Sequence, residues 1–150
     1  MIIVFQLIFS FLASAGFGIL FNAPRRALVN CGLTGAAGWI LYYFLREGGT
    51  DLILAAYTGA IGLTVMAIFF SRWMKMPIII FITCGIIPLV PGGTAYDTMR
   101  HVVMKEYTLA QVYAFEVMLT AGAIALGIIS AEMAYQVYQT IRGKVKRNEV

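Results

Sequence analysis

The chain alternates long apolar runs with short charged connections. Four runs contain no Asp, Glu, Lys or Arg and measure 24, 19, 20 and 21 residues: Met1–Pro24, Ala27–Leu45, Leu52–Ser71 and Met76–Tyr96. A bilayer core of about 30 Å is crossed by about 20 helical residues, so each run is long enough to form a transmembrane helix. The pattern therefore predicts an all-α, polytopic membrane protein.

A fifth apolar segment, residues 108–141, carries two glutamates. The longest uncharged piece between Glu116 and Glu132 is 15 residues, so a fifth helix must take at least one of them into the membrane, where ionisable groups are commonly functional. On a helix the two lie about 24 Å and about 160° apart, so they cannot act as a pair. Glu116 shares a stripe with Ala123 and Gly127 and is predicted to face protein or water, whereas Glu132 could extend to the interface.

Composition supports a single transmembrane domain over residues 1–150. Apolar residues make up 61% and charged residues 12%, which is unlike a soluble domain. Lipid gives helices no hydrophobic reason to associate, so small residues four apart predict faces of close packing. These faces are Ser14 with Gly18, Gly32 with Ala36, Ala55 with Gly59, and Ala123 with Gly127 and Ala131.

The basic residues predict the orientation. With five crossings and the N-terminus outside, eight Lys and Arg residues lie in the cytoplasm and three outside, as the positive-inside rule requires. The cytoplasmic set is Arg25, Arg26, Arg72, Lys75, Arg142, Lys144, Lys146 and Arg147, and the external set is Arg46, Arg100 and Lys105. If the fourth run entered and left on one side, the count would be six to five, so a true crossing and a cytoplasmic C-terminus are expected. The C-terminal basic cluster directly follows a span and is predicted to meet lipid rather than nucleic acid.

The fourth run contains a stretch unsuited to a continuous helix, IIPLVPGGTAY (Ile86–Tyr96). Pro88 and Pro91 cannot donate backbone hydrogen bonds, and each disfavours helical geometry in the residue before it. Gly92 and Gly93 add conformational freedom. The fourth helix is therefore expected to break between Pro88 and Gly93, and broken backbone at membrane depth needs protein or a water-filled cavity to satisfy it.

A new helix is expected directly after the break. The residues TAYD fit a helix-start pattern with Thr94 as the N-cap and Asp97 in the first turn. A short helix from about Ala95 to Glu106 would aim free N–H groups and its positive dipole end into the break, which suits a carboxylate. Asp97 could then bind an ammonium group, or Arg100 a second carboxylate. An ordinary proline kink followed by an extracellular loop explains the same residues without a binding site.

Three motifs together resemble a known family: GFGILFNAPRRAL (Gly16–Leu28), SRWMKMP (Ser71–Pro77) and IPLVPGGTAYDTM (Ile87–Met99). They are similar to the short subunit of the threonine/serine exporter family in its split, two-component form. The resemblance implies a secondary exporter in the inner membrane that works with a larger partner subunit on small amino acids, or in some pairs on a dicarboxylate such as succinate. It implies importance for these motif positions: Asn22, Pro24, Arg26, Arg72, Pro88, Pro91, Gly92 and Tyr96.

The odd number of predicted spans also suggests that the chain works with a partner. Many transporters are built from paired repeats, so a five-span chain suggests that a second polypeptide or a second copy supplies the other half. In such an exporter a buried Glu116 could carry a coupling proton. The rival hypotheses are a structural or regulatory subunit without a substrate site, and a homo-oligomeric channel.

Enzymatic and nucleotide-driven functions are not expected. The chain has no G-x-S-x-G, H-E-x-x-H, C-x-x-C or Walker motif, so neither hydrolysis nor an ATPase is indicated. Its one histidine, His101, is predicted to be a solvated loop residue outside the spans. Cys31 and Cys84 lie in apolar runs and are predicted to be buried small side chains, so no metal or other cofactor is expected.

Overall fold

The computed structural model describes the backbone of residues 2–148 and the side chains of residues 2–141. The cations Arg142, Lys144, Lys146 and Arg147, which the sequence assigns to the cytoplasm, lie outside the described side chains. The described part contains helices and no strands: α1 (Ile2–Leu20), η1 (Arg25–Ala27), α2 (Leu28–Glu47), α3 (Leu52–Met74), α4 (Ile78–Gly85), η2 (Ile87–Leu89), α5 (Gly92–Val103) and α6 (Tyr107–Asn148). Four helices are long and apolar enough to cross a membrane, and the bent α4–α5 pair is a fifth candidate. The predicted all-α polytopic fold is confirmed.

The turn after α1 contains Asn22 and Pro24, two positions of the motif GFGILFNAPRRAL. Asn22 adopts a left-handed conformation with φ of 55°, which asparagine tolerates better than most residues. The N–H groups of Asn22 and the next residue donate to the carbonyls of Ile19 and Gly18 at 3.0 and 2.8 Å, the bond pair that closes a helix in a Schellman motif. Pro24 follows and precedes η1. Asn22 and Pro24 therefore shape the reversal between α1 and α2.

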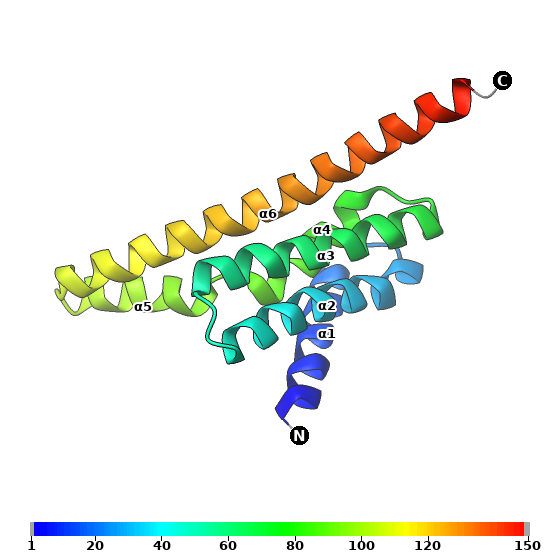
Figure 1. Cartoon of the computed structure of the whole chain (residues 1–150). Helices are drawn as coiled ribbons and strands as arrows, with labels where there is room; N and C mark the ends of the chain where they lie inside the picture. Colours follow the sequence, from blue (N-terminus) through cyan, green and yellow to red (C-terminus); the bar gives the residue numbers. More distant parts are fainter. Residues whose placement is uncertain (1, 149–150) are drawn as a thin grey trace.

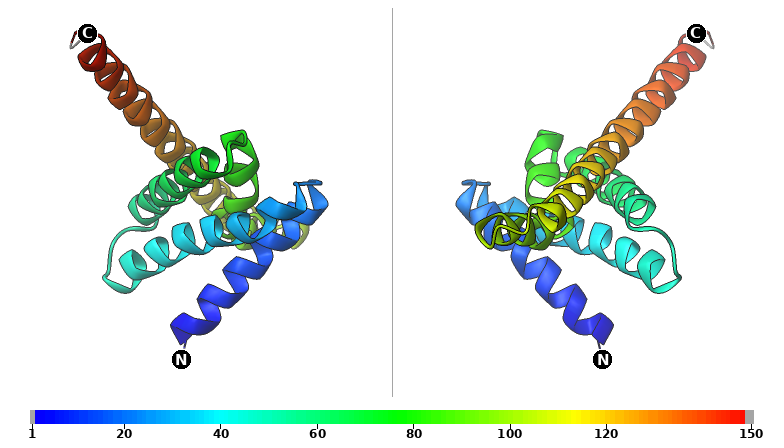
Figure 2. Two further views of the ribbon diagram at one scale, coloured as in Figure 1. Left: turned by 90° about the vertical axis from the view of Figure 1, so that its right-hand side faces the viewer. Right: turned by 90° about the vertical axis from the view of Figure 1, so that its left-hand side faces the viewer.

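The core lies between α2, α3 and α4, with α1 packed on one side and α6 on the other (Figures 1 and 2). Leu63 and Phe81 are among its largest fully buried side chains. Cys31 and Cys84 are buried there too, as predicted. Most other large apolar side chains are exposed, as expected of a surface that faces lipid.

The small-residue faces predicted from the sequence are all buried. They are Ser14, Gly18, Gly32, Ala36, Ala55, Gly59, Ala123, Gly127 and Ala131. The closest approach of α6 to α3 is at Gly127, where an added Cβ would lie 2.5 Å from the carbonyl oxygen of Tyr57 and 2.8 Å from Ala60 Cβ. Small side chains therefore let these helices touch almost backbone to backbone.

The helices α3 and α6 run in the same direction (Figure 1). Leu54, near the start of α3, shares a groove with Leu119 of α6, whereas Arg72, near the end of α3, lies over the ring of Tyr135. The α4–α5 segment must therefore carry the chain back from the end of α3 toward its start. This arrangement agrees with the predicted crossing and not with a segment that returns to the same side.

The basic residues of the described part divide between the two ends of the bundle. The start of α2 meets the end of α3, where Asn30 Nδ2 donates to Met74 Sδ at 2.6 Å. Arg25, Arg26, Arg72 and Lys75 consequently share one end, which we call the basic end. Arg46 closes α2 at the opposite end. The grouping is the one that the orientation prediction requires, and the assignment of the basic end to the cytoplasm stays a prediction.

Candidate functional site: a broken span and the hairpin it opens

The fourth span breaks where the sequence predicts. The segment Ile78–Leu89, which ends in the short helix η2, and α5 meet at 54°. Leu89 and Val90 donate their N–H groups to the carbonyl of Ile86 at 2.9 and 3.2 Å. Val90 is then extended, with ψ of 130°. The Val90 N–H also lies 3.4 Å from the carbonyl oxygen of Ile87, which is the group that Pro91 leaves without its regular helical donor.

One apolar side chain anchors the break. Leu89 is 6% exposed and occupies a notch between α2 and α3. A Cβ added at Gly38 would lie 3.2 Å from its Cδ1, and one added at Gly59 would lie 2.9 Å from its Cδ2. The absence of side chains at Gly38 and Gly59 therefore gives this leucine its room. Sequence reasoning missed Leu89 and Gly38, because a leucine between two prolines carries no signal of where it packs.

The helix after the break starts earlier than the sequence suggests. It begins at Gly92, with Pro91 as its N-cap and no side-chain capping bond, so the predicted cap by Thr94 is wrong. Thr94 is the third residue of α5 and Asp97 the sixth, because the helix resumes as soon as the prolines end. The two glycines are helical rather than a flexible link, and Cβ atoms added to them would meet nothing within 4 Å.

The start of α5 still has free backbone N–H groups of the kind that bind a carboxylate. The Ala95 N–H donates to the Pro91 carbonyl at 3.0 Å as the helix closes its first turn. The N–H groups of Gly93 and Thr94 lie ahead of that bond, at the end of a helix where donors have no helical acceptor. They point to the break, together with the positive end of the helix dipole.

The helices α5 and α6 form a tight antiparallel hairpin. Lys105 adopts φ of 63°, and the N–H groups of Lys105 and Glu106 donate to the carbonyls of Val102 and His101 at 3.0 and 2.9 Å, a second Schellman closure. His101 Nδ1 contacts Glu106 Oε2 at 2.6 Å. Its ring stacks on Tyr113, with centroids 5.2 Å apart and 11° between planes. The prediction of a solvated loop histidine is wrong, because α5 brings His101 against α6.

The stack of His101 on Tyr113 sets the register of the hairpin. Two helical turns from each of them toward the break lie Thr94 on α5 and Thr120 on α6, so these two are level with each other. By the same register Asp97 lies close to the level of Glu116. Thr94, Asp97 and His101 are half-buried, as Glu116 is. The structure thus brings Asp97 and Glu116 into one hairpin.

Other predicted site residues of α5 lie on a different face. Tyr96 and Arg100 are one turn apart and exposed, so neither packs against α6. Thr120 was not predicted, yet it is 4% exposed and its Oγ1 has no hydrogen-bond partner within the described part of the chain. Buried polar groups normally have partners. Nothing in an apolar run marks which of its hydroxyls lacks one, so this residue could not be found from sequence.

The hairpin projects beyond α2 and α3 at one end of the bundle (Figure 1). The helix α6 has 42 residues, about 63 Å at 1.5 Å per residue and roughly twice the bilayer core. Its first turns pair with α5 and its middle with α3. Among residues 2–141, no group of three His, Cys, Asp or Glu side chains is placed to hold a metal ion.

Comparison with known families supports the motif resemblance. The family model described as threonine/serine exporter, ThrE, matches residues 6–134. The chain belongs to the threonine/serine exporter family. This match runs past Met99 into α6, and so covers the break, the hairpin, Glu116 and Glu132. No solved structure matches the chain.

As a member of this exporter family, the chain is a multi-pass membrane protein of the transporter class. Its motif residues have distinct places in the structure. Asn22 and Pro24 build the turn after α1, whereas Pro88 and Pro91 build the break. The side chain of Arg26 is exposed at the basic end. Arg72 reaches across to α6 and stacks on Tyr135.

Proposed function

We propose that the chain is the small subunit of a secondary-active exporter of small carboxylate-bearing metabolites, working with a larger membrane subunit in the inner membrane. The substrates are amino acids of the threonine and serine type, or a dicarboxylate such as succinate. Family membership supports the transport class. The observation that carries the proposal is the broken fourth span, whose second half-helix aims its first N–H groups at the break.

The substrate carboxylate binds the N–H groups of Gly93 and Thr94 at the start of α5. Helix starts favour anions because donors and the positive dipole end meet there. Asp97, one turn further along α5, takes the ammonium group of an amino acid. Thr120 supports this placement, because by the hairpin register its unpartnered hydroxyl is level with Thr94.

A dicarboxylate would use the same helix start with a different second contact. Arg100 is the basic residue of α5 that could bind a second carboxylate, but it lies on the exposed face. It would reach a substrate only in a cavity that another subunit completes. The structure therefore favours amino acids for this chain's own groups and leaves succinate to a shared site.

A partner subunit is supported by the incomplete enclosure of the break. Gly92, Gly93 and Tyr96 are exposed, and the α5–α6 hairpin extends beyond the rest of the bundle. Irregular backbone at membrane depth needs cover from protein or a water-filled cavity. A larger subunit seated against this hairpin would supply it, in keeping with an odd number of spans.

Efflux measured with and without the partner tests this function. Cells that lack their own exporters are preloaded with labelled threonine, serine or succinate, and express this chain alone or together with its larger-subunit gene. We expect efflux only when both are present. Efflux from this chain alone would instead indicate a homo-oligomeric carrier or channel, and no efflux in either case would leave the break as a structural kink.

Glu116 is proposed to couple export to the proton gradient. It is a half-buried carboxylate in the hairpin that frames the break, and intramembrane carboxylates commonly carry protons. Glu116→Gln should leave export insensitive to an uncoupler, with Glu47→Gln as a control outside the hairpin. Unchanged sensitivity to the uncoupler in Glu116→Gln would dispose of this role.

A further inference from the structure

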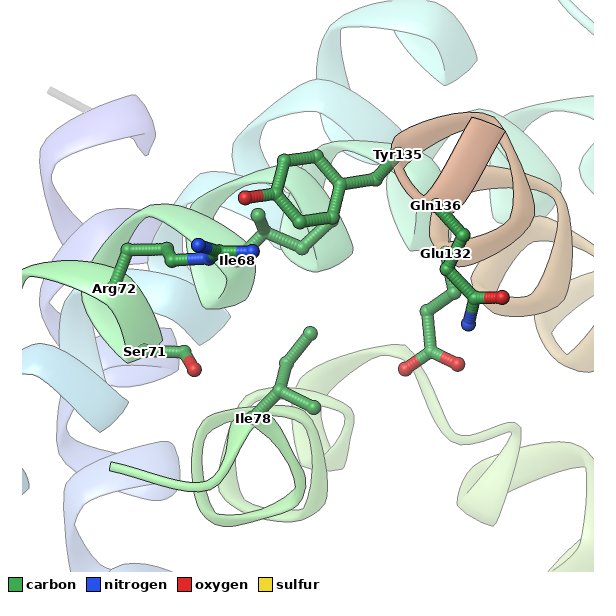
Figure 3. Close-up of a pocket in the computed structure, with 7 residues that line it drawn as sticks. All are labelled: Ile68, Ser71, Arg72, Ile78, Glu132, Tyr135 and Gln136. Atoms are coloured by element: carbon green, nitrogen blue, oxygen red, sulfur yellow. The ribbon is translucent and has the colours of Figure 1, made fainter. Parts of the chain in front are cut away.

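A cavity lies at the basic end of the bundle, between α3, α4 and α6. Its volume is about 250 Å³, roughly eight times the 30 Å³ that one water occupies in the liquid. The polar residues that line it are Ser71 and Arg72 of α3 with Glu132, Tyr135 and Gln136 of α6. The side chain of Ile78 points into the space from α4 (Figure 3). A small metabolite therefore fits among groups of both charges.

The two charged groups of this cavity are separated. Figure 3 shows the Arg72 guanidinium on one side and the Glu132 carboxylate on the other. In the part of the chain that the structure describes, the ion pair found is His101 with Glu106, and none joins Arg72 to Glu132. An arginine and a glutamate that line one cavity without pairing present separate contacts for a ligand that carries both charges.

The exposed Arg72 side chain contacts α6. Its Cζ lies 5.2 Å from the centroid of the Tyr135 ring, within the range of a cation–π contact. Because the guanidinium fork matches a carboxylate with two parallel hydrogen bonds, Arg72 is suited to bind one.

The polar neighbours complete a site for an amino acid. The Ser71 hydroxyl donates to the Met76 carbonyl at 2.7 Å, which fixes its oxygen as an acceptor. The Gln136 amide can donate or accept at the rim of the cavity. The Glu132 carboxylate, an acceptor on the opposite side, matches an ammonium group.

We propose that this cavity is a second substrate site, in which Arg72 binds the carboxylate and Glu132 the ammonium group of a small zwitterionic amino acid. The inference rests on the proposed export function. Tyr135 lies 15 residues after Thr120, about 22 Å along α6, so the site is distinct from the break. In the predicted orientation the basic end faces the cytoplasm, and an exported amino acid meets this cavity first.

Binding of an amino acid in the cavity is measured by how much it slows chemical labelling of a cysteine introduced at the rim. The native cysteines are buried, so a small polar maleimide should report on a Gln136→Cys variant at the rim. Gln139→Cys, on the same helix but not lining the cavity, is the matched control. L-threonine should slow labelling of Gln136→Cys and leave Gln139→Cys unchanged. Succinate, which has no ammonium group for Glu132, should protect much less.

Two charge-neutral variants test the assigned contacts. Arg72→Gln or Glu132→Gln, made in the Gln136→Cys background, should raise the threonine concentration for half-protection roughly 10- to 100-fold, the size expected for losing one charge-assisted hydrogen bond. Arg25→Gln and Glu47→Gln remove the same charges outside the cavity and should have no effect. Labelling of Gln139→Cys in each background shows that the protein is folded and present in equal amount.

The same labelling, done on membranes from cells that also carry the larger-subunit gene, distinguishes failure of the cavity site from failure of the export function. If those cells export threonine but threonine does not protect Gln136→Cys, the cavity site is wrong and the exporter assignment stands. If threonine protects while the cells export nothing, the site stands and the export function is wrong. Equal protection of Gln136→Cys with and without Arg72→Gln or Glu132→Gln would overturn the assigned contacts.

Discussion

The contact between α3 and α6 gives the sharpest test of the packing. In Gly127→Ala the new Cβ would lie 2.5 Å from the Tyr57 carbonyl oxygen, 0.9 Å short of the 3.4 Å of an ordinary contact. That oxygen belongs to the backbone and cannot rotate away, so α6 must move off α3. Overpacking of this kind costs about 1–3 kcal/mol. Gly122→Ala on the same helix is the matched control, because its Cβ would meet nothing within 4 Å.

The comparison of these two variants isolates the packing cost. Both gain the same helix propensity, up to about 1 kcal/mol for glycine to alanine, so that contribution cancels in their difference. Gly122→Ala should equal or exceed wild type in unfolding free energy, and Gly127→Ala should fall about 1–3 kcal/mol below Gly122→Ala. Unfolding of the purified chain by a denaturing detergent, followed by tryptophan fluorescence, measures both. Equal stabilities would refute the close approach of α6 to α3 at Gly127.

Further predictions concern the break, the first turn and the hairpin. Leu89→Ala empties the notch beside Gly59 and should lower the unfolding free energy by about 2–5 kcal/mol, whereas Val90→Ala, an exposed neighbour, should cost far less in the same assay. Asn22→Gly should match wild type in thermal stability, because Asn22 is left-handed, while Asn22→Ala should lose about 1 kcal/mol; equal stability of both would contradict that turn. His101→Leu removes the contact with Glu106 and should speed amide hydrogen exchange in α5, and unchanged exchange would count against the hairpin closure.

Local patterns were enough to predict much of the fold. Uncharged runs of bilayer length located the spans, and small residues four apart located buried faces, because both depend on the period of one helix. The break followed from the chemistry of Pro88 and Pro91 alone. The start of α5 was misplaced because TAYD fits a capping pattern, although a helix can resume immediately after Pro91 without a side-chain cap.

The remaining site features depend on which helices are neighbours. Nothing in the sequence relates Arg72 to Glu132, which lie 60 residues apart and share a cavity only because α3 and α6 are parallel neighbours. His101 was misread for the same reason, since its partner Tyr113 lies across a turn. On the evidence of its own helix, Glu132 could simply extend to the interface, and only the position of α3 places Arg72 across a cavity from it.

The most direct test of the substrate site at the break is the efflux selectivity of Asp97→Asn, measured in cells that express this chain with its larger subunit. The substitution removes the carboxylate assigned to the ammonium group and leaves the N–H groups of Gly93 and Thr94 in place. We predict that threonine efflux falls by roughly 10- to 100-fold, as expected for a lost charge-assisted contact, while succinate efflux, where wild type supports it, is retained. Unchanged threonine efflux, or loss of succinate efflux alone, would contradict the placement of an amino acid at the broken span.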